Sequence, residues 1–245
     1  MKTAELKTKE TEINPDEMME AGLHFGHSAS KTHPKMKEYI FGVRNSIHLF
    51  DTEKTAVKLK EALDFIKGLT AENKILLFVG TKIQAKDLVK DAAIETKSPF
   101  VVDRWLGGTI TNFGIIKNRI EYFKDLERKK ATGELEKYTK KERLKLDEEM
   151  QKLQMKFGGI KEMPRIPDAI FVVDIKEEAS AVAEAKQKGI KIIGICDTPV
   201  DPTKIDYPIP ANDDAISSIK YILDKVKDAI LKNRPKADNK EQKTE

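Results

Sequence analysis

Cysteine is almost absent from this sequence, because Cys196 is the only one in 245 residues. A single thiol excludes an internal disulfide and a metal site built from cysteines alone. Disulfides persist in oxidising compartments, so a chain that cannot form one within itself suits a reducing compartment. We therefore expect a cytoplasmic protein.

Long apolar runs are missing as well. No segment approaches the roughly 20 consecutive apolar residues of a membrane-spanning helix, and residues 1–13 lack the apolar centre of a secretory signal peptide. The sequence therefore predicts no membrane partner.

An excess of one sign of charge is also missing. The 45 Lys and Arg residues are nearly cancelled by 41 Asp and Glu, which leaves a net charge of +4 and an isoelectric point near 8.8. Modules dedicated to nucleic acid are usually more basic, so any contact with RNA must come from local clusters. Charged residues make up 35% of the chain and apolar residues 39%. This ratio is high for a compact globule and predicts that part of the chain projects.

Motifs that carry catalysis or bind nucleotides are missing too. No Ser-His-Asp order, paired-carboxylate motif, H-E-x-x-H, G-x-G-x-x-G or G-x-x-x-x-G-K-[ST] appears. Residues 79–82 resemble a strand-to-helix turn of a nucleotide site, but Gly80 lacks the companion glycines that form a phosphate cradle. Asp174 and Asp197 follow strand ends, where α/β enzymes place catalytic carboxylates, yet their surroundings favour turn caps. We expect no enzyme, no catalytic residue and no cofactor, with a nucleotide-binding α/β enzyme as the alternative.

What is present is an alternation of apolar strands and amphipathic helices. Continuous apolar runs, which suit strands covered on both faces, lie at 75–79, 100–102, 170–173 and 190–196, and helices are expected at 51–69, 81–96 and 177–188. In the first helix Val57, Leu59, Leu63, Ile66 and Leu69 recur at helical spacing, and a last helix should run to Lys232 from a cap at Asn212 or Asp213. Pro208 and Pro210 should prevent regular strand pairing. The pattern predicts an α/β fold with an open, mainly parallel, doubly wound sheet of the flavodoxin or Rossmann kind.

A long charged segment interrupts this alternation. Its apolar positions are spaced like a heptad in two stretches that can turn back on each other near 131–134, and they are Phe113, Ile116, Ile120 and Phe123, then Leu146, Met150, Leu153 and Phe157. We expect an antiparallel helical hairpin, either a solvated coiled coil or an arm that touches RNA or protein. The expected organisation is a mobile extension over 1–13, a globular domain over 14–108 and 159–232, the hairpin over 109–158 and a polar tail over 233–245.

The corner between the two parts has a sequence of its own. Gly107 and Gly108 allow a sharp turn, and Thr109, Thr111 and Asn112 offer oxygens to cap a helix that starts near Phe113. The apolar neighbours of Trp105 favour its burial, with an exposed stacking platform as the alternative. Strand alternation then predicts that Arg104 faces outward.

The N-terminal region combines a helix start, three histidines and an antiparallel pair. Asn14 should cap a short helix with Pro15 at its first position and Glu17 reaching back. Apolar runs at 39–41 and 47–50 indicate two antiparallel strands that turn at 44–45. His24, His27 and His33 raise the question of a metal site, but no cysteine lies nearby to complete four ligands. The alternative is that these histidines hydrogen-bond backbone in a tight loop.

Several blocks of this chain, taken in order, resemble the bacterial small-subunit ribosomal protein S-two family. The blocks are RWLGGTITN over 104–112, EAGLHFGH over 20–27, PKM over 34–36, YIF over 39–41, RNSIH over 44–48, FGGI over 157–160, PDAIFVVD over 167–174 and DYPIPANDDAI over 206–216. The resemblance covers about 14–232. The chain departs from the family text QTRRWNPKM at 28–36, where it reads SASKTHPKM, and from DTNCDPDG at 197–204, where it reads DTPVDPTK.

The resemblance implies a structural constituent of the small ribosomal subunit in translation. It implies binding to small-subunit (16S) ribosomal RNA near the head-body junction, contact with neighbouring ribosomal proteins and a role in docking the mRNA-binding protein S-one, with no homo-oligomer. Lysine and arginine position proteins on the phosphate backbone, so we take exposed basic residues of the loop, corner and hairpin as candidate RNA contacts. They are Lys31, Lys35, Lys37, Arg44, Arg104, Lys117, Arg119, Lys140 and Arg143.

Overall fold

The computed structural model describes residues 13–235, and its centre is a five-stranded parallel sheet. The expected extension over 1–13 and tail over 233–245 lie outside the described residues, apart from Ile13 and residues 233–235. The strand order is β5-β4-β6-β7-β8, with β4 at Leu76–Val79, β5 at Phe100–Val101, β6 at Ala169–Val172, β7 at Lys191–Cys196 and β8 at Tyr207–Pro210. The predicted α/β fold with a mainly parallel sheet is confirmed.

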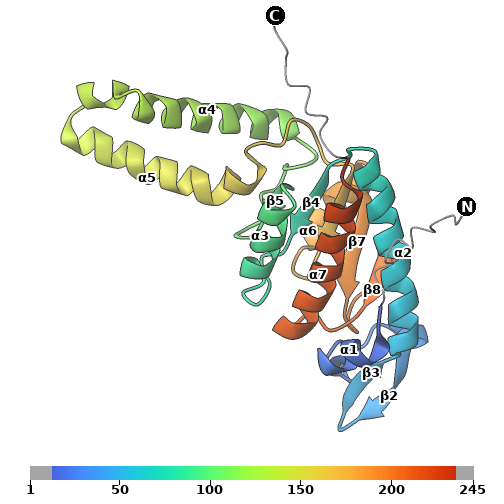
Figure 1. The fold of residues 1–245 in the computed structure, drawn as a ribbon. Coiled ribbons are helices and arrows are strands. Elements are labelled where there is room, and N and C mark those ends of the chain that lie inside the picture. Colours follow the sequence, from blue (N-terminus) through green and yellow to red (C-terminus); the bar gives the residue numbers. More distant parts are fainter. Residues whose placement is uncertain (1–12, 236–245) are drawn as a thin grey trace, which may run out of the picture.

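Helices cover both faces of the sheet (Figure 1). One face packs Phe78, Phe171 and Ile193 against α2 (Thr52–Ala71), α3 (Lys86–Glu95) and α7 (Ile216–Asn233). The opposite face packs Leu77 and Val172 against α6 (Ala179–Gln187) and the helical hairpin. Successive strand residues point to opposite faces, so the continuous apolar runs supply both cores.

Four details of the strand-helix units differ from the expectation. The expectation that Pro208 and Pro210 prevent pairing is wrong, because β8 pairs in parallel with β7 at the sheet edge, where a strand can lack amide donors. The helix after β4 starts at Lys86 rather than at residue 81. Val57 faces solvent, 57% exposed. The cap predicted at Asn212 or Asp213 is wrong, because α7 has Ala215 at its N-cap and no side-chain cap, and Asn212 Oδ1 accepts instead from the amides of Asp214 and Ala215 in the preceding turn.

A second, three-stranded antiparallel sheet lies at one end of the molecule. It has the order β1-β3-β2, with β1 at Phe25–Ser28, β2 at Ile40–Arg44 and β3 at Ile47–Phe50. The β2-β3 pair was predicted, and Asn45 and Ser46 make its turn with φ of 50° and 62°. Strand β1 was missed, because FGHS has no clear apolar alternation. Helix α1 (Pro15–Glu20) precedes it and is capped by Asn14 as predicted, and a 3-10 helix (Pro34–Tyr39) joins β1 to β2.

Helix α4 (Phe113–Ala131) and helix α5 (Lys140–Phe157) pack as an antiparallel pair that projects from the sheet (Figure 1). Gly133 turns the chain with φ of 75°, a 3-10 helix (Glu134–Lys137) follows, and Thr139 with Glu142 forms a capping box at the start of α5. Both predicted apolar stripes face inward. They continue into the core on one face of the sheet, so the base of the hairpin shares apolar packing with the globular part.

The chain passes from the end of the hairpin back to the parallel sheet at Gly159. A 3-10 helix (Gly158–Ile160) follows α5, and a β-carbon on Gly159 would lie 2.1 Å from the backbone oxygen of Phe100 in β5. Only glycine allows this approach, which joins the end of the hairpin to the edge of the parallel sheet.

The corner that starts the hairpin is held by Glu184 of α6, a residue that the sequence did not single out. Its carboxylate accepts from Trp105 Nε1 at 3.0 Å, from the amides of Gly108, Ile110 and Thr111 at 2.8–3.1 Å and from Thr111 Oγ1 at 2.9 Å. The predicted capping by Thr109, Thr111 and Asn112 is wrong, since the start of α4 has no side-chain cap and the Thr109 hydroxyl donates to the oxygen of Leu106.

Trp105 is buried, 8% exposed, and Arg104 is exposed. Both placements agree with the prediction, but the reason differs. Strand β5 ends at Val101, so the two residues lie in the following loop and strand alternation does not orient them. The orientation comes from Glu184 and from the apolar cluster that surrounds the indole.

Candidate nucleic-acid interface

The carboxyl edge of the parallel sheet is where an α/β enzyme would bind a nucleotide, and here it holds an ion-pair network. Lys82, three residues past β4, places its Nζ 3.1 Å from Asp174, 2.8 Å from Asp213 and 2.6 Å from Asp214. Burial opposes the positive charge, but the hydrogen bonds to Asp213 and Asp214 outweigh it and raise the pKa of Lys82. Burial, followed by the charges of Asp174 and Asp197, raises the pKa of Asp213 to about 7.

His27 of β1 closes this edge from the side of the antiparallel sheet. Its Nδ1 lies 3.0 Å from Asp197, its Nε2 lies 3.5 Å from Asp214, and its amide donates to Thr198 Oγ1 at 3.2 Å. The hydrogen bond to Asp197 raises the pKa of His27. The network therefore ties the two sheets together, which is a structural role for both carboxylates that follow strand ends.

A nucleotide would meet the wrong charge here. The pocket beside Lys82 has a volume of about 440 Å³, and Asp174, Asp213 and Asp214 all line it. Gly80 does not belong to a phosphate cradle, because a β-carbon there would lie 2.9 Å from Val89 of α3 and its absence is needed for helix packing. The arrangement therefore opposes phosphate binding and gives no support to the nucleotide-enzyme alternative.

The titration of His27 and Asp213 should make the fold less stable as pH rises. Both pKa values are raised in the folded state, from 6.5 for His27 and from 3.8 to about 7 for Asp213. The folded chain then holds these protons more tightly than the unfolded chain. The Asp213 contribution is lost as pH rises from 3.8 towards about 7, and the His27 contribution is lost above 6.5.

Urea unfolding of the parent and of His27→Gln at steps from about pH 5 to about pH 8 checks this. We expect the advantage of the parent over the variant to shrink as pH rises. A constant difference across that range would contradict the assignment of His27.

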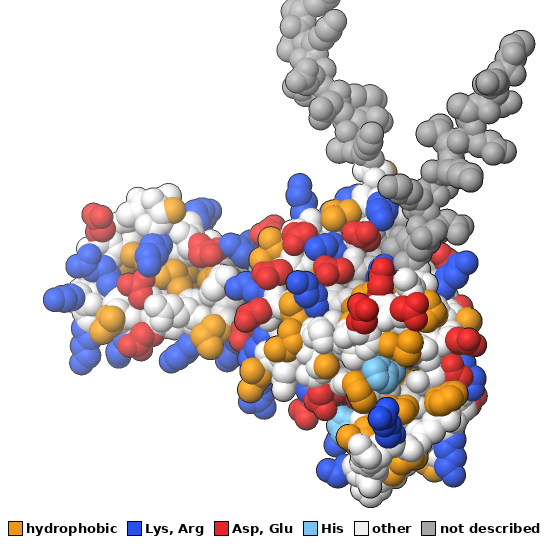
Figure 2. Space-filling model, turned by 60° about the horizontal axis from the view of Figure 1, so that its bottom comes forward, with side chains coloured by type: hydrophobic (Ala, Val, Ile, Leu, Met, Phe, Trp, Pro, Cys, Tyr) orange, Lys and Arg blue, Asp and Glu red, His pale blue; other side chains and the backbone are white. Residues whose placement is uncertain are grey.

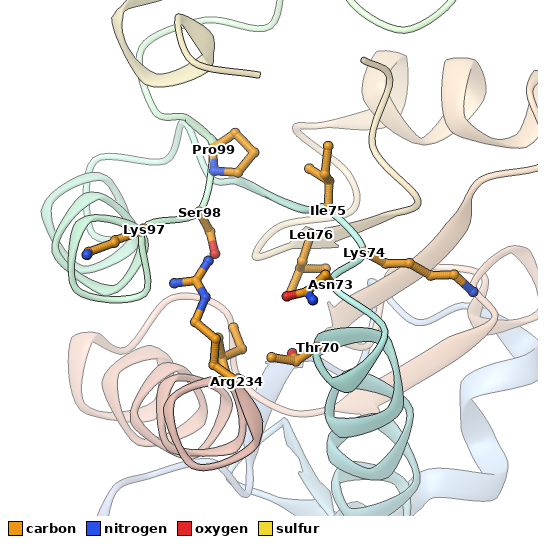
Figure 3. A pocket seen from close by; sticks show the side chains of 10 residues that line it. Thr70, Asn73, Lys74, Ile75, Leu76, Lys97, Ser98, Pro99 and Arg234 are labelled. Atoms are coloured by element: carbon orange, nitrogen blue, oxygen red, sulfur yellow. The ribbon is translucent and has the colours of Figure 1, made fainter. Parts of the chain in front are cut away.

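A second pocket lies at the opposite, amino edge of the parallel sheet, between α2, α7 and the end of α3 (Figure 3). Its volume is about 130 Å³. The Arg234 guanidinium reaches across it and donates to the backbone oxygen of Thr96 at 2.6 Å. Among its described lining residues none carries a carboxylate, an imidazole or a thiol, so it offers no acid-base pair for catalysis.

The three N-terminal histidines have separate environments. His27 belongs to the ion-pair network, and His33 Nδ1 accepts from the amide of Lys35, which is the expected role in a tight loop. His24 Nδ1 is buried without a hydrogen-bond partner in the described structure, and burial lowers the pKa of this side chain. Within residues 13–235 no group of three or more His, Cys, Asp or Glu side chains is arranged to hold a metal ion.

All nine candidate RNA contacts are exposed, but the structure does not bring them into one patch. Lys31, Lys35, Lys37 and Arg44 lie around the antiparallel sheet, whereas four others lie on the hairpin at the opposite end of the molecule (Figure 1). Arg104 lies between them, in the loop that leads to the corner. We call the first group the loop surface and the second, made of Lys117, Arg119, Lys140 and Arg143, the hairpin surface.

Ion pairing distinguishes most of these candidates from some other basic residues of the chain. Lys35 is neutralised in part, with its Nζ 3.2 Å from Asp201 and 2.8 Å from Thr203 Oγ1. The other candidates have no ion pair within the described chain. Several other basic residues of the hairpin are paired, among them Lys129 with Asp125 at 2.6 Å and Lys130 with Asp147 at 2.7 Å, and Lys161, just after the hairpin, pairs with Glu127. Within residues 13–235, no carboxylate neutralises the four charges of the hairpin surface.

The chain is therefore an α/β protein with an inserted helical hairpin, a carboxyl edge filled by its own ion pairs, and two separate groups of exposed basic side chains. The sequence profile of the family described as Ribosomal protein S2 matches residues 18–233, and the chain belongs to this family. It is a structural, non-enzymatic constituent of the small ribosomal subunit and acts in translation. In the described residues no helix is long and apolar enough to cross a membrane.

Proposed function

We propose that the protein binds small-subunit (16S) ribosomal RNA near the head-body junction through the loop surface, Arg104 and the hairpin surface. The observation that carries this proposal is that these exposed basic side chains, apart from Lys35, have no ion pair in the described chain, whereas other basic side chains of the hairpin are already paired. Release of counterions from RNA phosphates drives such contacts. Neighbouring small-subunit proteins, including the mRNA-binding protein S-one, are the proposed protein partners of a single copy of this chain.

Replacing Lys140 and Arg143 together by alanine tests the hairpin surface. Both side chains are exposed on the first turn of α5, so the fold should stay within about 1 kcal/mol of the parent. Binding to 16S RNA should weaken whatever the sequence at the contacted site, because phosphate contacts do not depend on sequence. The magnitude of the slope of log affinity against log salt should fall by roughly two, one for each lost charge. The matched control is Lys129→Ala with Lys130→Ala, whose charges are already paired. An equal loss in the control would contradict the selection of the hairpin surface.

We also propose that the hairpin is a separable unit. Replacing residues 113–156 by a short Gly/Ser linker should leave one cooperative unfolding transition, because the parallel sheet keeps its remaining helices. The melting temperature should fall, since the base of the hairpin packs on the same core as Trp105. Thermal melts monitored by circular dichroism check this, and loss of the folded transition would show that the hairpin is part of the core. In the folded variant, incorporation into small subunits should weaken.

A further inference from the structure

Strand β2 carries the most exposed aromatic ring of the described residues. Phe41 is 80% exposed, and Val43, two residues further along the strand, is 56% exposed. Strand β2 is an edge strand of the antiparallel sheet, so no further strand of the described chain covers it on its outer side. Exposed apolar side chains that gather in a patch mark contacts with other molecules, so this edge strand is a candidate contact surface.

The charge around Phe41 selects the kind of molecule. Residues 28–50 hold four basic side chains and one acidic one. Lys37 precedes β2, Arg44 ends it, and neither has an ion pair within the described chain. Figure 2 brings this end of the molecule forward and shows hydrophobic side chains interspersed with basic ones. An apolar ring flanked by basic side chains that have no ion pair is complementary to a polyanion that carries flat apolar faces.

Another exposed apolar side chain has the opposite surroundings. Ile83, 85% exposed, lines the pocket that also contains Asp174, Asp213 and Asp214. Acidic surroundings oppose a polyanion, so exposure alone does not distinguish the two positions. The sign of the neighbouring charge does, and it makes Ile83 a matched control.

We propose that Phe41 stacks on an unpaired base of small-subunit ribosomal RNA while Arg44 and Lys37 contact phosphates of the same strand. The proposal rests on the proposed function and adds a mode of recognition. The protein would recognise single-stranded RNA by stacking Phe41 on an unpaired base. Exposed aromatic side chains on sheets bind splayed bases in this way, because every base has a π-face and the basic groups track the backbone. Val43 extends the apolar contact along β2.

The experiment measures binding of the full-length protein to deproteinised 16S ribosomal RNA across a salt series. We expect Phe41→Ala to weaken binding by about fivefold to a hundredfold, the range for loss of one stacked base. Its salt slope should match that of the parent, because no charge is lost, and Phe41→Trp should restore binding. Arg44→Ala should lower the salt slope by about one, and Ile83→Ala should bind like the parent.

Stability separates a binding effect from a folding effect. Phe41 is mostly exposed, so Phe41→Ala should melt within the range of a surface substitution. If Phe41→Ala binds 16S RNA like the parent while the Lys140/Arg143 variant does not, stacking is overturned and the proposed function stands. If neither variant changes binding, the proposed function fails as well. Normal binding to free RNA with poor incorporation into subunits would assign Phe41 to a protein neighbour and overturn the stacking proposal.

Discussion

Replacing Trp105 by alanine is expected to lower the free energy of unfolding by about 3–5 kcal/mol, the range for deleting a large buried aromatic side chain. The indole is 8% exposed, it belongs to the core that joins the sheet to the hairpin, and its Nε1 donates to Glu184 at 3.0 Å. The substitution therefore leaves a cavity and removes one of the donors that hold the corner. Arg104→Ala, at the exposed neighbour, should stay within about 1 kcal/mol of the parent.

Chemical denaturation of both variants, with Trp105→Phe as a third, measures these effects. Phenylalanine keeps most of the apolar volume but lacks the Nε1 donor. The loss of unfolding free energy in Trp105→Phe should therefore lie between the losses in Trp105→Ala and Arg104→Ala. In salt titrations with 16S RNA, Arg104→Ala should weaken binding while its stability is unchanged. If Trp105→Ala instead unfolds like the parent and loses RNA binding, the indole is a stacking residue and the roles of the two side chains are reversed.

Glu184→Ala is expected to lower the free energy of unfolding by about 2–4 kcal/mol, because it leaves several donors without an acceptor at a partly buried site. The carboxylate accepts from the amides of Gly108, Ile110 and Thr111 and from two side chains, with donors on both of its oxygens. Glu184→Gln should cost nearly as much, since its amide nitrogen would face donors instead of accepting from them. The position of the hairpin depends on this corner, so both variants should also incorporate poorly into subunits.

Acid titration gives an independent test of Glu184. Burial raises the pKa of this carboxyl, but hydrogen bonds from Thr111, Trp105, Gly108 and Ile110 outweigh it and leave the pKa below its usual value of 4.5. The stabilising contribution is present above 4.5 and is lost as pH falls through the lower folded-state pKa. The parent should therefore lose stability faster than Glu184→Gln below about pH 4.5. Parallel curves for parent and variant would contradict this role.

Local sequence patterns predicted the elements that local physics determines. The apolar runs became parallel strands because both faces of the sheet are covered, and the heptad stripes became the inward faces of α4 and α5. Asn14 caps α1 as predicted from its own neighbourhood, and Asp51 caps α2 where that helix was expected to start. Strand β8 was missed because its prolines argue against a central strand, and only the fold shows that it is an edge.

The contacts that organise the site link residues far apart in the chain, so local patterns could not reveal them. Glu184 reaches the corner across more than 70 residues, and His27 meets Asp197 from a different sheet. The candidate RNA contacts were chosen by residue type, which predicted their exposure but not their separation into two surfaces. Lys35 shows the same limit, because its partner Asp201 lies in a loop 166 positions away. Phe41 was predicted to lie in a strand, and its exposure required the structure.

We propose that this small-subunit constituent is held on ribosomal RNA by basic side chains that have no ion pair within the described chain. Sucrose-gradient sedimentation of gently lysed cells tests it most directly, with the protein followed across fractions at low and high salt. The account predicts that the protein sediments with small subunits at low salt and leaves them only at high salt, and that the Lys140/Arg143 double variant leaves at lower salt than the parent. A protein found entirely in the free pool at low salt, or purified with a stoichiometric mononucleotide, would contradict it.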